Sequence, residues 1–448
     1  MTVRLLTGAG LVCTVLLAGS PAWAHGVGAR GDLPVPLWWA IYGAVAVLVF
    51  SFAALARMWP EPRLENPAGG LLLPPNFDRA ADVLRVGGRF VGTGILAVVV
   101  VSAANEGDLP AYALFIGLWV AVPLVAAVLG DAWSLLNPLA ALADLIGSAG
   151  IGTAPPWLER AGHLPAAMLL LSFGWLELAH PNAADPTVVL VFLSLYAAVL
   201  SVGGLVWGRA WIDQADAFGV YFGLVGRLGL FERDEEGRLR LRAPIVGSTQ
   251  VKPVRGTALV VLAALGVTSF DGLTRSSLWS SILDRRTGWS AVPLNTLGLL
   301  VMVGIVAAAY WLSMRWISRV VDEPTAELAE RFAHSLVPIA LGYAIAHYFS
   351  LLVFDGQLFL AFASDPMNLG WDLFGTVGNS IDFTVMSTET IALVQVFAII
   401  AGHVTGVVLA HDRAVGRFPA EVANRSQHAL FGAMVLYTVG GLVLLLGA

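Results

Sequence analysis

The chain has 448 residues, of which 57% are hydrophobic and only 12% are charged. Soluble globular proteins carry about 25% charged residues, so this composition excludes an ordinary soluble protein. The formal net charge of −6 is small, and no basic face indicates nucleic-acid binding. Apolar runs long enough to cross a bilayer recur along the whole length, which predicts an all-α, polytopic membrane helix bundle.

The segment 1–24 has the features of a cleaved signal peptide. A basic start is followed by an apolar stretch, and Ala22-Trp-Ala24 forms a small-x-small cleavage site. We therefore expect a mature chain that begins at His25 and forms a single transmembrane helical domain, 25–448. The one cysteine, Cys13, lies in the signal, so the mature chain has no thiol for disulfides, catalysis or metal binding.

Ten windows of the mature chain are apolar enough to form membrane spans. Of the 25 Lys and Arg residues, 20 then fall in loops on one side, four fall on the other side, and one lies in the signal. Because basic loops stay in the cytoplasm, we expect a cytoplasmic-membrane protein with both mature termini outside. The expected spans are 37–56, 86–104, 111–130, 164–181, 187–207, 257–273, 294–314, 333–354, 389–410 and 429–447.

Three segments between these spans have a distinct character. The polar segment 209–256 is expected to be a cytoplasmic loop, in which the alternation of Gly237–Arg242 predicts a strand of a small hairpin. Its arginines 238, 240 and 242 are expected to contact anionic headgroups. The segment 131–162 is apolar but broken by prolines, which favours an interfacial or re-entrant position. The acidic segment 355–388 lacks basic residues, which suits a solvated loop or a vestibule that collects cations.

Ionisable side chains inside membrane spans are costly, so they mark candidate functional sites. Toward the outer side, Asp271 ends one expected span, and His347 lies at a matching depth in another. We expect these two side chains to face each other, and we assign both, together with Glu177, as candidate catalytic residues. An imidazole beside a carboxylate can exchange a proton or orient toward a metal.

A metal site is a second candidate feature. Glu177-Leu-Ala-His180 has the Glu-x-x-His spacing of carboxylate-rich metal bundles, but such bundles need two of these motifs and this chain has one. His25, at the mature N-terminus, offers an amine and an imidazole to copper. The alternative for each histidine is a hydrogen-bonded position inside the bundle. The sequence does not identify a cofactor, but a divalent transition metal is the one that these side chains could bind. The candidate metal ligands are His347, His180, His403, His334 and His25.

Several patterns that define other classes are missing from the sequence. There is no Gly-x-x-x-x-Gly-Lys loop, no Gly-x-Ser-x-Gly elbow and no His-Glu-x-x-His motif. Nucleotide-driven pumping, esterase chemistry on an α/β-hydrolase fold and zincin proteolysis therefore lose support.

Six stretches give the chain a likeness to one family. It resembles the bacterial multi-pass membrane proteins known as fenitrothion hydrolases, over nearly the whole mature chain. That resemblance implies hydrolysis of an organophosphorus triester to a phenol and a dialkyl thiophosphate, and it assigns no catalytic residues. The stretches are Ala24–Gly28 with Asp32–Pro36, Gly130–Pro138, Thr268–Gly272, His334–Gln357, Ala401–Arg413 and Tyr437–Gly441.

Two classes of function stay open at this point. The first is a membrane-embedded organophosphate hydrolase with a His/Asp/Glu site. The second is a non-enzymatic membrane transporter or a metal-handling protein, with copper as the metal. An enzyme should gather its ionisable residues at one depth, whereas a transport pathway should distribute them across the bilayer. The expected partners are membrane lipids and a lipophilic small molecule or a metal ion.

Overall fold

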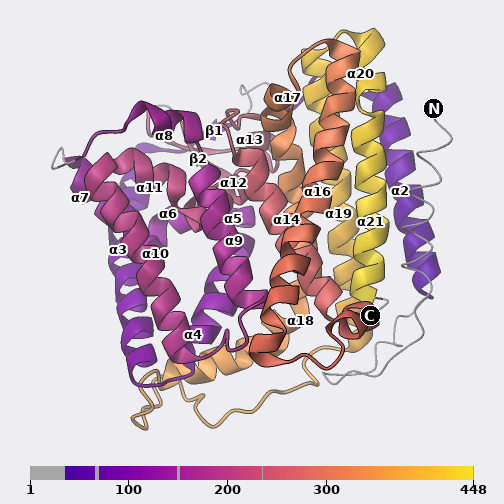
Figure 1. Cartoon of the computed structure of the whole chain (residues 1–448). Helices are drawn as coiled ribbons and strands as arrows, with labels where there is room; N and C mark the ends of the chain where they lie inside the picture. Colours follow the sequence, from indigo (N-terminus) through magenta and orange to yellow (C-terminus); the bar gives the residue numbers. More distant parts are fainter. Residues whose placement is uncertain (1–35, 66–69, 149–151, 235, 447–448) are drawn as a thin grey trace.

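The computed structural model describes residues 36–65, 70–148, 152–234 and 236–446. Over these residues the chain is a helix bundle with one small β-sheet at one end (Figure 1). The expected signal peptide at 1–24 and the candidate ligand His25 lie outside the described residues.

Nine helical segments of the described residues are long and apolar enough to cross a membrane. Proline in the first turn begins several of them, since its missing N–H costs nothing there. The all-α polytopic prediction is confirmed, and the chain is a multi-pass membrane protein. The segments are α2 (Leu37–Met58), α3 (Pro75–Ala104), α4–η2–α5 (Leu109–Leu129), α10 (Pro186–Trp207), α14 (Thr257–Thr274), α16 (Val292–Val321), α17–η4–α18 (Thr325–Ser364), α19 (Thr388–Arg417) and α21 (His428–Leu446).

The expected fourth span, 164–181, is not among these nine segments and is shorter than predicted. It corresponds to α9 (Leu164–Leu178), whose 15 residues extend about 22 Å at 1.5 Å per residue. That length falls short of a hydrocarbon core of about 30 Å. The remaining helices are shorter still or lie at the ends of the bundle: α6 (Trp133–Leu136), α7 (Pro138–Ser148), α8 (Pro156–Ala161), α11 (Arg209–Ala215), α12 (Ala217–Gly226), α13 (Val246–Thr249), α15 (Ser277–Leu283) and α20 (Ala420–Ser426).

One end of the bundle carries the sheet, and we call it the basic end because most arginines of the connecting segments lie there. The sheet has the order β1-β3-β2, with β1 (Leu71–Leu72) and β2 (Phe231–Arg233) both antiparallel to β3 (Leu239–Leu241). The predicted hairpin is thus confirmed. The opposite end, which carries the segment 365–387, is the acidic end; Figure 1 shows these two ends at the top and the bottom of the bundle.

The segment 209–256 is less of a polar loop than expected. Its first part forms α11 and the apolar α12, which is buried between neighbouring helices. The expectation of headgroup contacts is wrong for Arg242, because that side chain is buried and donates hydrogen bonds to the carbonyls of Gly229 and Gly226. The guanidinium therefore secures the hairpin to the bundle.

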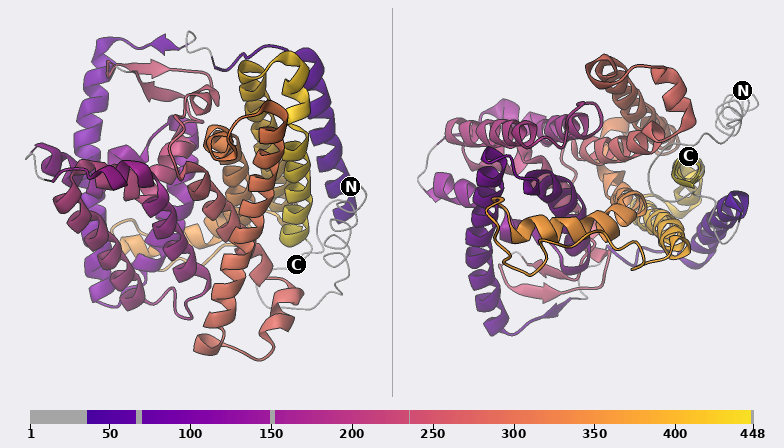
Figure 2. Two further views of the ribbon diagram at one scale, coloured as in Figure 1. Left: turned by 45° about the horizontal axis from the view of Figure 1, so that its top comes forward. Right: turned by 90° about the horizontal axis from the view of Figure 1, so that it is seen from below.

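Helix α14 lies at the centre of the bundle and positions the candidate site. In its apolar window 83% of the residues are buried, against 22% for α2 and α3 at the edge. Helices α9, α16, α18 and α21 pack around it, and the two further views in Figure 2 show this surrounded position. The polar side chains of Thr257, Thr268, Ser269 and Asp271 on α14 are accordingly buried in protein.

Helices α18 and α19 are in close contact along a glycine seam, formed by Gly342, Gly402 and Gly406. A Cβ atom on Gly402 would lie 2.5 Å from the carbonyl oxygen of Pro338, and one on Gly406 would lie 2.7 Å from that of Ser335. Only glycine permits this approach. These glycines therefore allow α19 to pack directly against the backbone of α18 and of the turn before it.

Candidate functional site

Asp271 and His347 form a buried pair near the acidic end of the bundle. The Nε2 atom of His347 on α18 lies 2.6 Å from the Oδ2 atom of Asp271 on α14. His347 is only 4% exposed and Asp271 is only 6% exposed. The juxtaposition expected from the matching depths of the two residues is therefore confirmed, and the carboxylate fixes the orientation of the imidazole ring.

Arg275 connects this pair to the surface. It follows Asp271 by one helical turn, and its Nη2 atom lies 3.5 Å from Asp271 Oδ2. The side chain of Arg275 is 43% exposed, whereas that of Asp271 is 9% exposed. The Asp271 carboxylate thus lies between a buried imidazole and a guanidinium that reaches the edge of the bundle.

Glu177, the third predicted residue, joins the same cluster through a tyrosine. Its Oε1 atom accepts a 3.0 Å hydrogen bond from the hydroxyl of Tyr348, and the ring of Tyr348 packs edge-on against the ring of His347 at 4.9 Å. The Oε2 atom of Glu177 is buried and has no hydrogen-bond partner among the described residues. An unpartnered carboxylate oxygen in an apolar interior is costly when ionised.

The formal charges of the cluster balance only with an additional proton. Asp271 and Glu177 contribute two negative charges and Arg275 contributes one positive charge, so the sum is −1 when His347 is neutral. A proton on either His347 or Glu177 brings the sum to zero. Because unbalanced charge inside a membrane bundle is unfavourable, this arrangement favours one proton that two groups can carry.

Aromatic side chains extend the cluster toward the middle of the bundle. Tyr343 lies one turn before His347, with its ring 5.6 Å from that of Tyr437 on α21. The hydroxyl of Tyr437 lies 2.7 Å from the Oγ atom of Ser269, and its ring lies 5.9 Å from that of His403 on α19. The polar groups therefore continue from the pair to mid-depth.

His403, a predicted metal ligand, ends this polar row. Its Nδ1 atom donates a 2.8 Å hydrogen bond to the carbonyl of Ile399, which leaves the lone pair of Nε2 available. Nε2 is buried without a partner among the described residues. His403 is thus an interior histidine with one unpartnered ring nitrogen, and tyrosine rings separate it from His347.

His180 does not join the Asp271–His347 pair. Its Nδ1 atom accepts a 3.2 Å hydrogen bond from the backbone N–H of Asn182. Its ring packs edge-on against Trp175 at 5.8 Å and Trp289 at 5.2 Å. Glu177 and His180 of the Glu-x-x-His motif therefore lie in different surroundings, although they belong to the same helix end.

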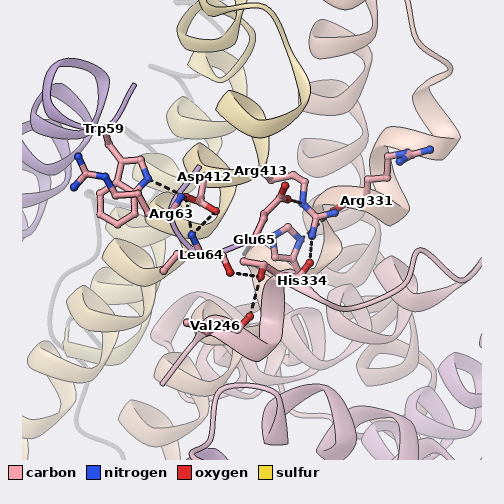
Figure 3. A network of polar contacts seen from close by, with 10 residues as sticks. Trp59, Arg63, Leu64, Glu65, Val246, Arg331, His334, Asp412 and Arg413 are labelled. Atoms are coloured by element: carbon pink, nitrogen blue, oxygen red, sulfur yellow. Dashed lines mark hydrogen bonds and ion pairs between the residues drawn. The ribbon is translucent and has the colours of Figure 1, made fainter. Parts of the chain in front are cut away.

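A second polar network lies at the basic end, around Asp412 (Figure 3). The carboxylate of Asp412 accepts hydrogen bonds from Trp59 Nε1 at 2.8 Å and from the backbone N–H groups of Arg63 at 2.6 Å and Leu64 at 3.2 Å. His411 binds the carbonyl of Trp59 at 3.0 Å. These contacts fasten the segment after α2 to the end of α19.

His334, a predicted metal ligand, and Arg413, which follows Asp412 in the sequence, complete this network. The Nδ1 atom of His334 lies 2.9 Å from the carbonyl of Arg331. Arg413 pairs with Glu65 at 2.5 Å. The pKa of the Glu65 carboxyl is nevertheless raised, because burial outweighs the attraction of Arg413. The network fixes the basic end and is distant from the Asp271–His347 pair.

The candidate metal ligands do not converge in the part of the chain that the structure describes. No group of three His, Asp or Glu side chains there is arranged to hold a metal ion. His347 directs Nε2 to Asp271, and His180, His403 and His334 have the separate surroundings described above. The described residues thus do not fit a metal centre at this site.

Sequence reasoning missed the tyrosines of the site. Tyr348 and Tyr437 carry the hydroxyls that connect the ionisable groups, yet tyrosine in a membrane helix also occurs as an interfacial anchor. The spacing of Tyr343 and His347, four residues apart on one helix face, was the available signal. This spacing indicates that the two side chains share one helix face, but it does not identify the residues on other helices that they contact.

No protein-family model matches the sequence, and comparisons with curated proteins and with solved structures found no match either.

Proposed function

We propose that the protein is a proton-coupled membrane transporter and that Asp271, His347 and Glu177 bind the coupling proton. The observation that carries this proposal is the charge balance of a buried cluster. Two carboxylates and one guanidinium belong to the same cluster as an imidazole, and neutrality requires one proton that His347 or Glu177 can hold. Ionisable groups in this setting are typical of proton relays in membrane proteins.

The distribution of polar groups supports a pathway over a single reaction centre. They begin at exposed Arg275, continue through the Asp271–His347 pair and the tyrosines, and reach His403 at mid-depth. A second polar layer around Asp412 lies at the other end. The ionisable residues thus occur at both depths, as expected of a pathway.

Proton movement through reconstituted protein tests the proposal. The full chain is placed in liposomes that contain a pH-sensitive dye, and a membrane potential drives proton entry. Asp271→Asn, His347→Gln and Glu177→Gln should each reduce the flux about 10- to 100-fold, since each removes a charge-assisted interaction or the proton carrier itself. His428→Ala is the matched control, because His428 is an exposed histidine at the start of α21, and it should leave the flux unchanged.

A spectroscopic readout keeps the test independent of any co-transported solute. Infrared difference spectra between acid and neutral pH should contain a band from a buried carboxylic acid, and Glu177→Gln should remove it. Wild-type protein that neither conducts protons nor shows this band would overturn the proposal. Folded variants with wild-type flux would do the same.

Organophosphate hydrolysis is a second candidate, favoured by the Asp271–His347 dyad and by the family resemblance. A carboxylate that orients an imidazole is the arrangement by which enzymes activate water as a nucleophile. In this reading His347 accepts the proton of a water that attacks phosphorus, and a phenolate leaves. Release of the phenol from a thiophosphate triester by wild-type protein, lost in His347→Gln and kept in His428→Ala, would support hydrolysis.

A further inference from the structure

A cavity of about 930 Å³ lies at the basic end, between α14, α16 and α17. Its walls are mainly apolar and include Leu259 and Leu262 from α14, and Ala308 and Trp311 from α16. Spacings of three residues place each pair on one helix face. Cavities that bind small molecules measure about 300–1,000 Å³, so this one is large enough for a ligand.

The cavity borders the lipid-facing surface of α16. Trp311, which lines it, is 46% exposed, and the neighbouring side chains of Ile305 and Leu312 are 58% and 64% exposed. Such apolar surface on a membrane-spanning helix contacts hydrocarbon chains. A molecule can therefore enter the cavity sideways from the bilayer.

Two arginines stand at the rim of the cavity. Arg255 is exposed and uses Nη1 for one 3.2 Å hydrogen bond to the carbonyl of Arg160. Arg331 on α17 has a buried Nε atom without a hydrogen-bond partner among the described residues. Both guanidinium groups therefore retain donors for an anion, and a guanidinium binds a phosphate with two parallel hydrogen bonds.

The two acidic residues of the rim are engaged differently. The carboxylate of Glu330 accepts hydrogen bonds from the backbone N–H groups of Gly256 at 2.7 Å and Ala258 at 2.9 Å, so it caps α14. Glu327 has a side chain that is 59% exposed and lies 3.7 Å from Arg331. A phosphate can replace this loose ion pair while Glu327 turns to water.

We propose that this cavity binds an anionic phospholipid, independently of the transport function. The phosphate lies between Arg255 and Arg331, and an acyl chain lies along α14 and α16. Basic pockets between membrane helices recognise anionic headgroups in this way. The combination of apolar walls, lateral access and free guanidinium donors matches both parts of such a lipid.

The test compares two phospholipids on the purified full chain. Delipidated protein is titrated with phosphatidylglycerol or phosphatidylcholine in detergent, and bound lipid is counted by native mass spectrometry. We expect one phosphatidylglycerol to bind in preference to phosphatidylcholine. Arg255→Gln and Arg331→Gln should each weaken binding about fivefold, and Arg319→Gln is the matched control, an exposed arginine of α16 outside the cavity.

Two further variants distinguish this site from general surface attraction. Glu327→Gln should tighten phosphatidylglycerol binding, because it removes the competitor for Arg331. Ala308→Trp should fill the cavity and abolish binding, and thermal unfolding of that variant verifies its fold. Equal binding of both lipids, arginine variants that behave like Arg319→Gln, or binding that survives Ala308→Trp would each overturn the proposal.

Discussion

Replacing Gly402 by alanine should destabilise the bundle by forcing α18 and α19 apart. The added Cβ would lie 2.5 Å from the carbonyl oxygen of Pro338 and 3.2 Å from the Cα atom of Gly342. Both neighbours are backbone atoms, so neither can swing away. Because carbon atoms are in comfortable contact at about 3.5–4.0 Å, the helices must separate by roughly 1 Å.

The expected magnitude combines two opposing effects. Overpacking a tight contact costs about 1–3 kcal/mol, whereas alanine gains about 0.5–1 kcal/mol over glycine inside a helix. The free energy of unfolding of Gly402→Ala should therefore fall by about 1 kcal/mol, and by about 2.5 kcal/mol at most. Gly440→Ala on α21 is the control, because a Cβ at that position meets nothing within 4 Å, and it should be neutral or stabilising.

Unfolding by SDS in mixed micelles, followed by circular dichroism, measures both variants. Gly342→Ala should behave like Gly402→Ala, and the double variant should lose less than the sum of the two, since both act on the same contact. A Gly402→Ala protein as stable as Gly440→Ala would refute the close packing of α18 on α19.

Three further predictions concern the hydrogen bonds of Tyr348 and Asp412 and the burial of His163. Tyr348→Phe removes the only hydrogen-bond donor to Glu177 among the described residues and should lower stability by about 0.6–2 kcal/mol, measured in the same micelles; unchanged stability would contradict that bond. Asp412→Asn weakens the acceptor of two backbone N–H groups and should make the segment 59–64 sensitive to protease, whereas resistance equal to wild type would count against the fastening role. Burial lowers the pKa of His163 from 6.5 to about 4, so the unfolded chain takes up a proton first as the pH falls. Stability should decline from pH 6.5 toward pH 4, and His163→Gln should remove this part of the decline in thermal unfolding.

The sequence was sufficient for the helix bundle and for the central pair of the site. Apolar length alone gave nine of the ten expected spans, because a helix must satisfy its own backbone in lipid. The cost of burying charge directed Asp271 and His347 inward, and their matching depths on two parallel helices placed them side by side. Their contact at 2.6 Å shows that matching the depths of ionisable residues in two spans can identify a pair in contact.

Other features depended on how the helices rotate against one another, which a single sequence does not specify. His180 and Glu177 share one helix end, yet the indole rings of Trp175 and Trp289 surround His180 while Tyr348 binds Glu177. The partner of Asp412 is a loop more than 340 residues away in the chain. Arg242 was expected at the surface because charged residues usually are, but three backbone carbonyls bind it inside.

The two polar layers of the bundle are separated by the glycine seam, and this separation shapes the proposed transport. His403 ends the acidic-end layer and His411 belongs to the basic-end layer; the two residues are eight positions apart on α19, which corresponds to about 12 Å. Gly406 within this stretch and Gly402 just before it hold the backbone of α19 against the start of α18. In the proposed transport, a proton on the Asp271–His347 pair would have to pass this close contact of α18 and α19 to reach the basic end. Under that proposal, the seam that stabilises the fold would also be the barrier that the transport cycle opens.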